Sequence, residues 1–380
     1  MFAFQRYKLR HLNILLLMGI AFLACVGILV IKSATLSTGE SSTYLKQIMG
    51  VCVSTGVMVF VAMVDYHFII RMHIPIYLAM VVVLVLTIAG PFKTAAGTGA
   101  YRWIRIGPIQ LQPSEFAKVA VVVFLAGFFS HFQDRVNAFG VIALSVIFTG
   151  VILLLIMKQP DLSTSMVIMV IFTAMIFSAK ISYKWVLGVI AVVAPFAAML
   201  VFLVEKDMIP FLENYQRNRI LSFLHPQDYP DLARQQLTSV MAIGSGGLYG
   251  KGLFNESLDS VKNGNYLSEE DTDFIFAVVG EELGFAGCCL IIGVLLFVVI
   301  QCLITAARAK DMEGRLIACG IAAQITFQSF ANIGVATFIL PNTGLPLPFI
   351  SAGLSSLLSV FIGAGMVLNI SMQRRRDVQQ

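Results

Sequence analysis

Three acidic side chains flank or interrupt one apolar stretch near residue 280. Asp273 follows the most polar part of the chain, whereas Glu281 and Glu282 lie inside the apolar sequence after it. An ionised carboxylate in hydrocarbon is costly without a partner or water, so such residues mark functional sites by default. On a helix, Glu281 would lie about 12 Å beyond Asp273 and within about 80° of the same face, with Glu282 nearly opposite. We expect Asp273 to stay ionised and accept a proton, and one glutamate to pair with a lysine or arginine.

A second group of charged residues surrounds Pro113, a residue that suits the first turn of a helix. Glu115 would then lie at the positive helix end, and Lys118 one turn further on the same face. Arg102 and Trp103 precede them. Two interpretations stay open for this basic group: ordinary anchoring at the membrane interface, or a clamp for phosphate at the membrane surface.

Two further segments combine charge with turn residues. Lys158 and Asp161 lie between two apolar runs, and Asp161 either caps the following helix or belongs to the site. Arg217 and Arg219 lie in the polar segment that follows. The glycine-rich stretch 244–252 contains Lys251 but does not match a Walker A motif. A flexible surface turn and close packing on a lipid-linked pyrophosphate both remain possible for that stretch.

The segment 341–356 contains three prolines, which exclude a continuous helix. Non-helical backbone at membrane depth is tolerated only inside protein or beside a wet cavity. We therefore expect this segment, with Pro348 and Ser351, to form a wall of the site.

The composition defines the class of protein that carries these residues. Of 380 residues, 58% are hydrophobic and only 12% are charged, and apolar runs near the length of a membrane span recur. The net charge of +5 lies mostly at the chain ends and in short loops, which is typical of topology signals and not of nucleic-acid binding. The sequence therefore predicts an all-α polytopic membrane protein that binds no nucleic acid.

The apolar runs predict about ten spans in a single domain, 1–380, with a large extracytoplasmic loop at 205–272. Basic residues at both chain ends place both termini in the cytoplasm. Residues 90–112 are expected to form an irregular Gly/Thr-rich loop. The expected spans are about 12–31, 48–64, 76–89, 113–129, 141–157, 165–179, 185–204, 273–307, 316–340 and 352–372.

Cysteine and histidine spacing gives no sign of a disulfide or metal site. The six cysteines all lie in apolar runs and form no CxxC pair. The five histidines are scattered along the N-terminal tail and loops. The sequence therefore defines no metal ligands.

Several motifs together carry a family resemblance. In chain order they are residues 102–104, 112–115, 159–162, 272–274, 280–282 and 346–351. This combination, with the ten spans and the outer loop after the seventh, resembles the SEDS proteins (shape, elongation, division and sporulation), typified by RodA and FtsW. The resemblance covers essentially the whole chain. Short tails and residues 250–253 favour a RodA-like member, with the division and sporulation branches left open.

The resemblance implies a peptidoglycan glycosyltransferase of the bacterial cytoplasmic membrane that polymerises lipid II into a nascent glycan strand. It implies Asp273 as the catalytic residue and a class B penicillin-binding protein as partner, beside other cell-wall synthesis membrane proteins. Asp273 would act as general base, and undecaprenyl pyrophosphate would leave. The sequence departs from the family pattern at residues 268–271, Ser163, Ala352 and Leu354.

The expected supporting residues fall into two sets. Six basic residues are candidates for binding the pyrophosphate: Arg102, Lys118, Arg217, Arg219, Lys158 and Lys251. Six others are expected to support the site: Glu115, Asp161, Glu281, Glu282, Pro348 and Ser351. A divalent cation, Mg²⁺ or Mn²⁺, could replace part of the clamp. The alternative functions are a lipid II flippase and a non-catalytic scaffold of the cell-wall synthesis complex.

Overall fold

The computed structural model describes residues 11–38, 41–89, 93–95, 101–107, 109–182, 214–254 and 271–373. The predicted span 185–204 and the basic chain ends lie outside these residues. The described part is mostly helical, as predicted. Its helices are α1 (Ile14–Thr38), α2 (Ser41–Met63), α3 (Tyr66–Arg71), α4 (His73–Ala89), α5 (Pro113–His131), α6 (Phe139–Met157), α7 (Leu162–Ser178), α9 (Asn214–Leu224), α10 (Pro230–Ser245), α11 (Ile275–Ala307), α12 (Met312–Ala336) and α13 (Leu354–Met372).

Seven of these helices are long and apolar enough to cross a membrane, and α4 and α7 are shorter apolar helices. Their positions match nine of the predicted spans, and the total of ten stays a prediction. Pro113 begins α5 at its first turn, where the missing N–H costs nothing. Asp311 caps α12 by accepting a hydrogen bond from the Gly314 backbone N–H at 2.8 Å. The chain is a multi-pass membrane protein.

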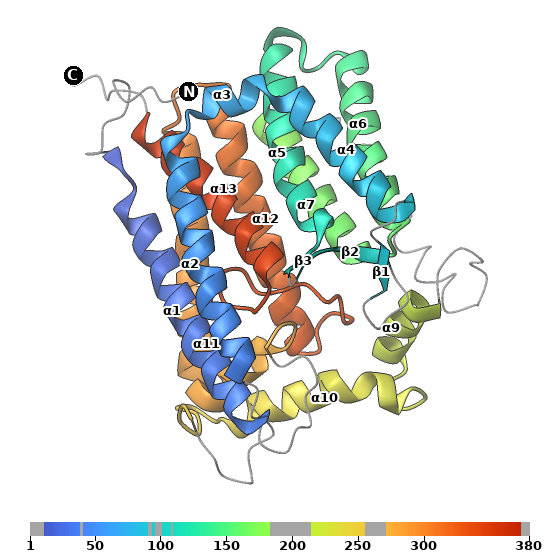
Figure 1. Ribbon diagram of the computed structural model, residues 1–380, viewed down its shortest axis with the longest axis vertical. Helices are drawn as coiled ribbons and strands as arrows, with labels where there is room; N and C mark the ends of the chain where they lie inside the picture. Colours follow the sequence, from blue (N-terminus) through green and yellow to red (C-terminus); the bar gives the residue numbers. More distant parts are fainter. Residues whose placement is uncertain are drawn as a thin grey trace.

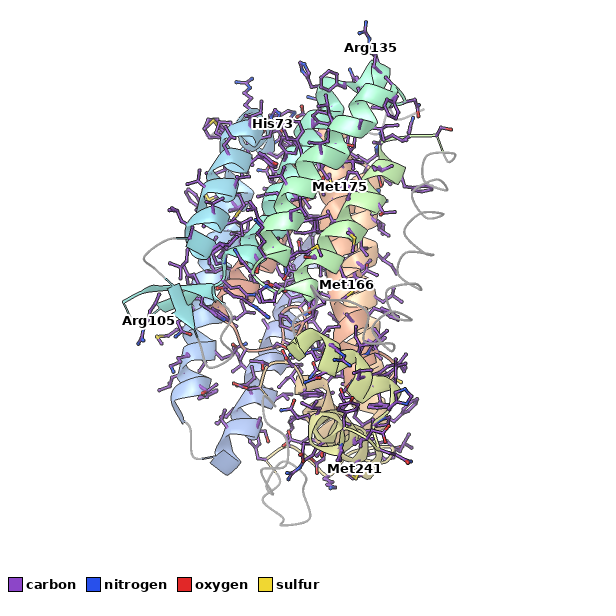
Figure 2. The ribbon with its side chains drawn as sticks, turned by 90° about the vertical axis from the view of Figure 1, so that its right-hand side faces the viewer. His73, Arg105, Arg135, Met166, Met175 and Met241 are labelled. Atoms are coloured by element: carbon purple, nitrogen blue, oxygen red, sulfur yellow. The ribbon has the colours of Figure 1, made fainter. Side chains whose placement is uncertain are left out.

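The helices form an elongated bundle whose two ends differ (Figure 1). α1 begins and α13 finishes at the end that carries α3, where the Asn13 backbone N–H donates to Ser371 Oγ at 3.2 Å. α10 crosses the opposite end. Figure 2 shows the same two ends of the bundle, with Arg135 labelled at one end and Met241 at the other. The segment 214–254 therefore lies opposite the end where the described chain starts and stops.

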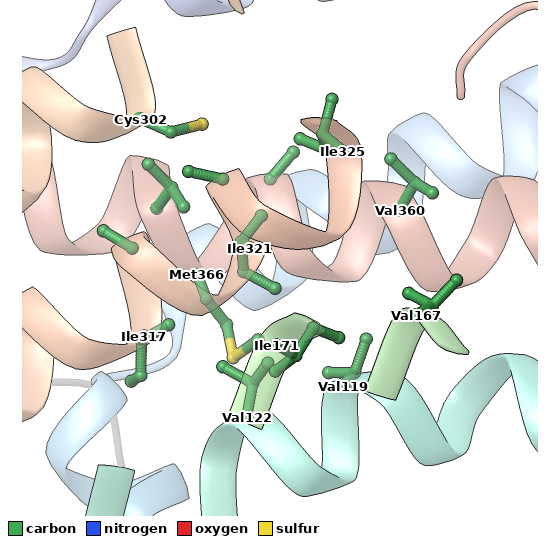
Figure 3. Packing of buried hydrophobic residues seen from close by; sticks show 14 of the residues in the cluster. Val119, Val122, Val167, Ile171, Cys302, Ile317, Ile321, Ile325, Val360 and Met366 are labelled. Atoms are coloured by element: carbon green, nitrogen blue, oxygen red, sulfur yellow. The ribbon is translucent and has the colours of Figure 1, made fainter. Parts of the chain in front are cut away.

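The interior is built where α12 packs between α5, α7 and α13 (Figure 3). A Cβ atom at Gly320 of α12 would lie 2.9 Å from Val122 of α5 and 3.0 Å from Met175 of α7. A Cβ atom at Gly363 of α13 would lie 2.7 Å from Ile321. Small residues let helices approach closely where lipid gives no hydrophobic drive for association. This close packing holds the helix ends that carry the site.

Residues 90–112 do not form the irregular loop that we expected. They contain a three-stranded antiparallel sheet in the order β1 (Lys93–Ala95), β2 (Tyr101–Ile106), β3 (Ile109–Leu111). Arg105 pairs with Gln110 across a turn that contains Gly107, whose φ is +62°. Four of the six residues of β2 are aromatic or β-branched, which suits a strand, and this signal was missed because the neighbouring Gly and Thr residues favoured a loop.

The segment 205–272, predicted as an extracytoplasmic loop, contains the helices α9 and α10 within its described residues. One expectation about local structure was also wrong. The long helix after Asp273 is interrupted, because Gly284 adopts φ +66° and ψ −166° inside α11. Only glycine reaches such a conformation at little cost.

Candidate functional site

Asp273 lies half-buried just before α11, with its backbone held by a neighbouring helix. The Asn332 side-chain amide on α12 donates to the Asp273 carbonyl at 2.9 Å and to the Leu345 carbonyl at 2.8 Å. Asn332 is almost wholly buried, at 1% exposure. One buried amide therefore fixes Asp273 relative to both α12 and the proline-rich segment.

The proline-rich segment lies directly against the residues around Asp273. Ser351 Oγ donates to the Thr272 carbonyl at 2.7 Å and accepts from the Leu347 backbone N–H at 2.8 Å. The Ala352 backbone N–H donates to the Asp271 carbonyl at 2.9 Å. Pro348 is buried within the same segment. Ser351 thus holds the segment as one side of the candidate site.

Arg219 of α9 reaches the same place as Asp273. Its Nη1 donates to the Asn342 carbonyl at 3.1 Å. A Cβ atom at Gly344 would lie 3.3 Å from Asp273 Oδ2 and 3.4 Å from Arg219 Nη1. The carboxylate and the guanidinium therefore converge on Gly344. Arg217 lies two residues earlier on α9, and a rotation of about 100° per residue directs it to another side of that helix.

Lys118 and Glu115 form a buried ion pair on α5. Lys118 Nζ lies 2.8 Å from Glu115 Oε2, and the exposures of the two side chains are 0% and 6%. Ser359 Oγ on α13 donates to the Glu115 carbonyl at 2.7 Å. The structure thus gives Lys118 an internal partner and buries its charge inside the bundle.

Asp161 both caps α7 and joins it to α5, so the two interpretations of this residue are not exclusive. It accepts from the Thr164 backbone N–H at 3.1 Å. Its Oδ2 accepts from Ser114 Oγ at 2.9 Å and from Gln112 Nε2 at 3.1 Å. Thr164 Oγ1 donates a fourth hydrogen bond to the same carboxylate, and Asp161 is only 3% exposed. Asp161 therefore joins the starts of two helices inside the bundle.

Arg102 ties the small sheet to the turn before α7. Its Nε donates to the Gln159 carbonyl at 2.9 Å and its Nη2 to the Pro160 carbonyl at 2.6 Å. These bonds use carbonyl groups that a turn leaves without helical partners. Lys158 in the same turn is exposed. Arg102 therefore has a structural role in the described chain, beside its candidacy as an anion contact.

The expected pairing of a buried glutamate with a basic residue is confirmed. Lys251 Nζ lies 2.8 Å from Glu281 Oε1, and Glu281 is 1% exposed. Glu282, also buried, accepts a hydrogen bond from Ser33 Oγ of α1. The two glutamates thus hold α11 to the glycine-rich stretch and to α1.

The glycine-rich stretch 246–252 packs against the break in α11, a contact that neither interpretation of it included. The Gly252 backbone N–H donates to the Glu282 carbonyl at 3.0 Å, and the Phe285 N–H donates to the Gly247 carbonyl at 2.9 Å. A Cβ atom at Gly250 would lie 2.1 Å from the Glu282 carbonyl oxygen. Its glycines allow close approach to protein backbone, and the stretch satisfies groups that the break exposes.

Sequence reasoning missed Asn332 and Gln112, both of which bind the backbone or side chains of predicted site residues. A signal existed for Asn332, because it is a polar residue within an apolar span. No three His, Cys, Asp or Glu side chains gather around Asp273 among the residues that the structure describes. That part of the chain offers no protein cage for a divalent cation at this site.

Comparison with known proteins identifies the family of the chain. The cell cycle protein family of FtsW, RodA and SpoVE matches residues 8–376. The chain belongs to this family. It is 33% identical over 380 residues to a protein of Geobacter metallireducens named probable peptidoglycan glycosyltransferase FtsW, covering 98% of this chain and 96% of that one. It is 34% identical over 302 residues to the peptidoglycan glycosyltransferase MrdB of Escherichia coli K12, covering 79% and 78%.

Solved structures of this family share the fold. One, from work on polymerization and crosslinking by a peptidoglycan synthase complex, matches with a TM-score of 0.79 at 24% identity, over 96% of this chain and 99% of that one. The rod shape determining protein RodA of Thermus thermophilus matches with a TM-score of 0.69 at 22% identity, over 98% of each chain. The family and the apolar helices place the chain in the bacterial inner membrane as a multi-pass protein.

Proposed function

We propose that this protein is a peptidoglycan glycosyltransferase that polymerises lipid II, with Asp273 as the general base. Asp273 would accept the proton of the acceptor sugar 4-hydroxyl as its oxygen attacks the anomeric carbon of the donor. Undecaprenyl pyrophosphate would leave with the electron pair of the broken bond. A positioned general base contributes about 10²–10⁴-fold to such a reaction.

The observation that carries this proposal is the fixed position of Asp273 at a half-buried helix start. Asn332 donates to the Asp273 carbonyl at 2.9 Å, and Ser351 donates to the Thr272 carbonyl at 2.7 Å. A rigid mounting matters because misplacement of a catalytic group by about 1 Å can cost about 10²-fold in rate. Relatives named as peptidoglycan glycosyltransferases support the reaction class.

Arg219 is the cation that we assign to the leaving pyrophosphate. It is the predicted basic residue that lies with Asp273 at Gly344, next to the residue proposed as base. A guanidinium can donate two parallel hydrogen bonds to phosphate oxygens and so stabilise charge that develops as the bond breaks. Arg219 would therefore contribute more in the transition state than in the bound substrate.

An apolar groove offers a place for the lipid chain of the substrate. It has a volume of about 610 Å³ and is lined mainly by α4, α5 and α13, with Val61 of α2, Ile69 of α3, Ile104 of β2 and Leu111 of β3. Ile104 lies two residues from Arg102 on the same strand, so the groove reaches the small sheet. A polyprenyl chain in this groove would keep its phosphate end near the sheet.

The expected partner is a class B penicillin-binding protein, whose transpeptidase would cross-link the new strand. The similar solved structure from work on a peptidoglycan synthase complex supports this pairing. The nascent glycan strand and other cell-wall synthesis membrane proteins are the remaining expected partners. Relatives named FtsW and MrdB match at nearly equal identity, so the elongation, division and sporulation roles all stay open.

The experiment is polymerisation of purified lipid II by the full-length protein with its penicillin-binding partner. Asp273→Asn should abolish glycan chains while the protein still folds and binds its partner. Asp231→Asn, which removes an exposed carboxylate at the start of α10, is the matched control and should keep normal activity. Normal polymerisation by Asp273→Asn would exclude the proposed mechanism.

A second candidate function is lipid II translocation, and one observation favours it. The amide groups of Gln324 and Gln328 on α12 are buried and make no hydrogen bond to any residue that the structure describes. With Asn332 they recur every four residues, so they share one face of α12 that leads into the bundle from the Asp273 end. A polar track of this kind is what a flippase needs. Transfer of labelled lipid II across proteoliposomes by Asp273→Asn, without polymer, would favour this function.

A further inference from the structure

A separate cluster of titratable side chains lies at the other end of the bundle, far from Asp273. His67 of α3, Asp311 at the cap of α12 and Glu313 in its first turn bring one ligand atom each within 4.8 Å of one another. His67 Nε2 lies 3.0 Å from Asp311 Oδ2. We propose that these three residues bind a first-row divalent transition-metal ion, for which Zn²⁺ is the suitable probe.

The spacing of the three atoms suits metal coordination. Tetrahedral Zn–N and Zn–O bonds of about 2.0–2.2 Å place neighbouring ligand atoms about 3.3–3.6 Å apart. The 3.0 Å between His67 Nε2 and Asp311 Oδ2 is slightly shorter, and a bound ion would separate these two atoms by a few tenths of an ångström. An imidazole with two carboxylates favours Zn²⁺ or a similar ion over Mg²⁺, which prefers oxygen ligands alone.

Each of the three proposed ligands is oriented by an outer partner. Asp65 Oδ1 lies 2.8 Å from His67 Nδ1, which leaves Nε2 directed at Asp311. Tyr66 donates to Asp311 Oδ2 at 2.6 Å, and Ser130 donates to Glu313 Oε1 at 3.2 Å. A carboxylate on the second nitrogen of a histidine is the usual arrangement around a bound metal, and such partners raise affinity about 10–100-fold.

The charge and the exposure of the cluster also fit a cation from solution. Three carboxylates, including Asp65, surround a single imidazole. No lysine or arginine of the described chain lies within ion-pair distance of any of them. The side chains of His67 and Asp311 are 29% and 31% exposed, so an ion can reach them. A metal here would tie α3 to the start of α12.

The test is Zn²⁺ binding to the full-length protein, purified in detergent and stripped with a chelator. We expect one tight Zn²⁺ per chain and at least a tenfold loss of affinity in His67→Gln and in Glu313→Gln. His131→Gln is the matched control, because His131 is exposed at the end of α5, outside the cluster. The Zn²⁺ affinity of this variant should equal that of the wild type. Asp65→Asn should weaken binding by about 10–100-fold without changing the number of ions bound.

Two results would overturn the proposal. The first is wild-type affinity in both His67→Gln and Glu313→Gln, which would place the bound ion elsewhere. The second is no Zn²⁺ bound by the wild type, which would mean that a protonated His67 bridges Asp65 and Asp311 instead. If His67→Gln fails to fold, Glu313→Gln still tests the proposal. Its effect on folding should be smaller, because the Glu313 side chain makes one hydrogen bond within the described chain, to Ser130. Co²⁺ substitution adds a readout independent of activity, since its visible absorption reports nitrogen and oxygen ligation.

Discussion

The Asn332 amide donates one hydrogen bond to the Asp273 carbonyl at 2.9 Å and a second to the Leu345 carbonyl at 2.8 Å. A single buried side chain of α12 thus holds both the residue proposed as base and the segment that faces it. The two segments lie far apart in the chain, so their relative position depends on α12. The geometry of the site is therefore set by helix packing as well as by the residues that would touch substrate.

Substitution of Asn332 should separate positioning from binding. We expect Asn332→Ala to lower kcat for lipid II polymerisation by about 10–100-fold, with a much smaller change in KM, because the base is displaced while the cations stay in place. Asn137→Ala is the control, since Asn137 accepts a bond from the Ser182 backbone N–H at the opposite end of the bundle. An unchanged kcat in Asn332→Ala would show that the Asp273 backbone needs no such support.

The buried pair of Lys118 and Glu115 should behave as a unit in stability measurements. Lys118→Met leaves an unpaired carboxylate at 6% exposure, and losing one partner of a buried pair costs about 3–5 kcal/mol. The double variant Lys118→Met/Glu115→Gln should recover much of that loss. Unfolding in mixed detergents gives the four free energies of the double-mutant cycle. Simple additivity would mean that the pair is not coupled.

Local patterns predicted some features of this protein well. The apolar runs located the helices, and the cost of a carboxylate in hydrocarbon predicted that Glu281 or Glu282 would have a basic partner, which is Lys251. The break at Gly284 could not be predicted in this way, because the glycine-rich stretch that bonds to its backbone lies some 35 residues earlier in the chain.

Long-range side-chain partners were equally hidden from the sequence. Asp161 looked like either a helix cap or a site residue, and only the approach of Ser114 and Gln112 from α5 showed that it joins two helices. His67 and Asp311 are 244 residues apart, so no spacing pattern could bring them together. Such contacts follow from how the helices pack, which local sequence does not encode.

Two glycines of the stretch 246–252 should differ sharply in their tolerance to alanine. A Cβ atom at Gly250 would meet the Glu282 carbonyl oxygen at 2.1 Å, whereas one at Gly252 would meet nothing within 4 Å. Both have positive φ, of +78° and +93°, so both pay a similar conformational cost of about 1–2 kcal/mol. We expect Gly250→Ala to lower the melting temperature clearly more than Gly252→Ala. Equal shifts would show that the stretch does not pack tightly on α11.

Arg219 should affect the departure of pyrophosphate more than the binding of lipid II. It converges with Asp273 on Gly344, and its Nη1 bonds to the Asn342 carbonyl at 3.1 Å. We expect Arg219→Ala to lower kcat by about 10²–10³-fold, as loss of one preorganised donor does elsewhere. Arg219→Lys should recover little, because an ammonium cannot donate in a bidentate manner. Arg234→Ala removes an exposed arginine of α10 and should match the wild type. If Arg219→Ala instead raised KM with kcat unchanged, Arg219 would hold the substrate and not stabilise the leaving group.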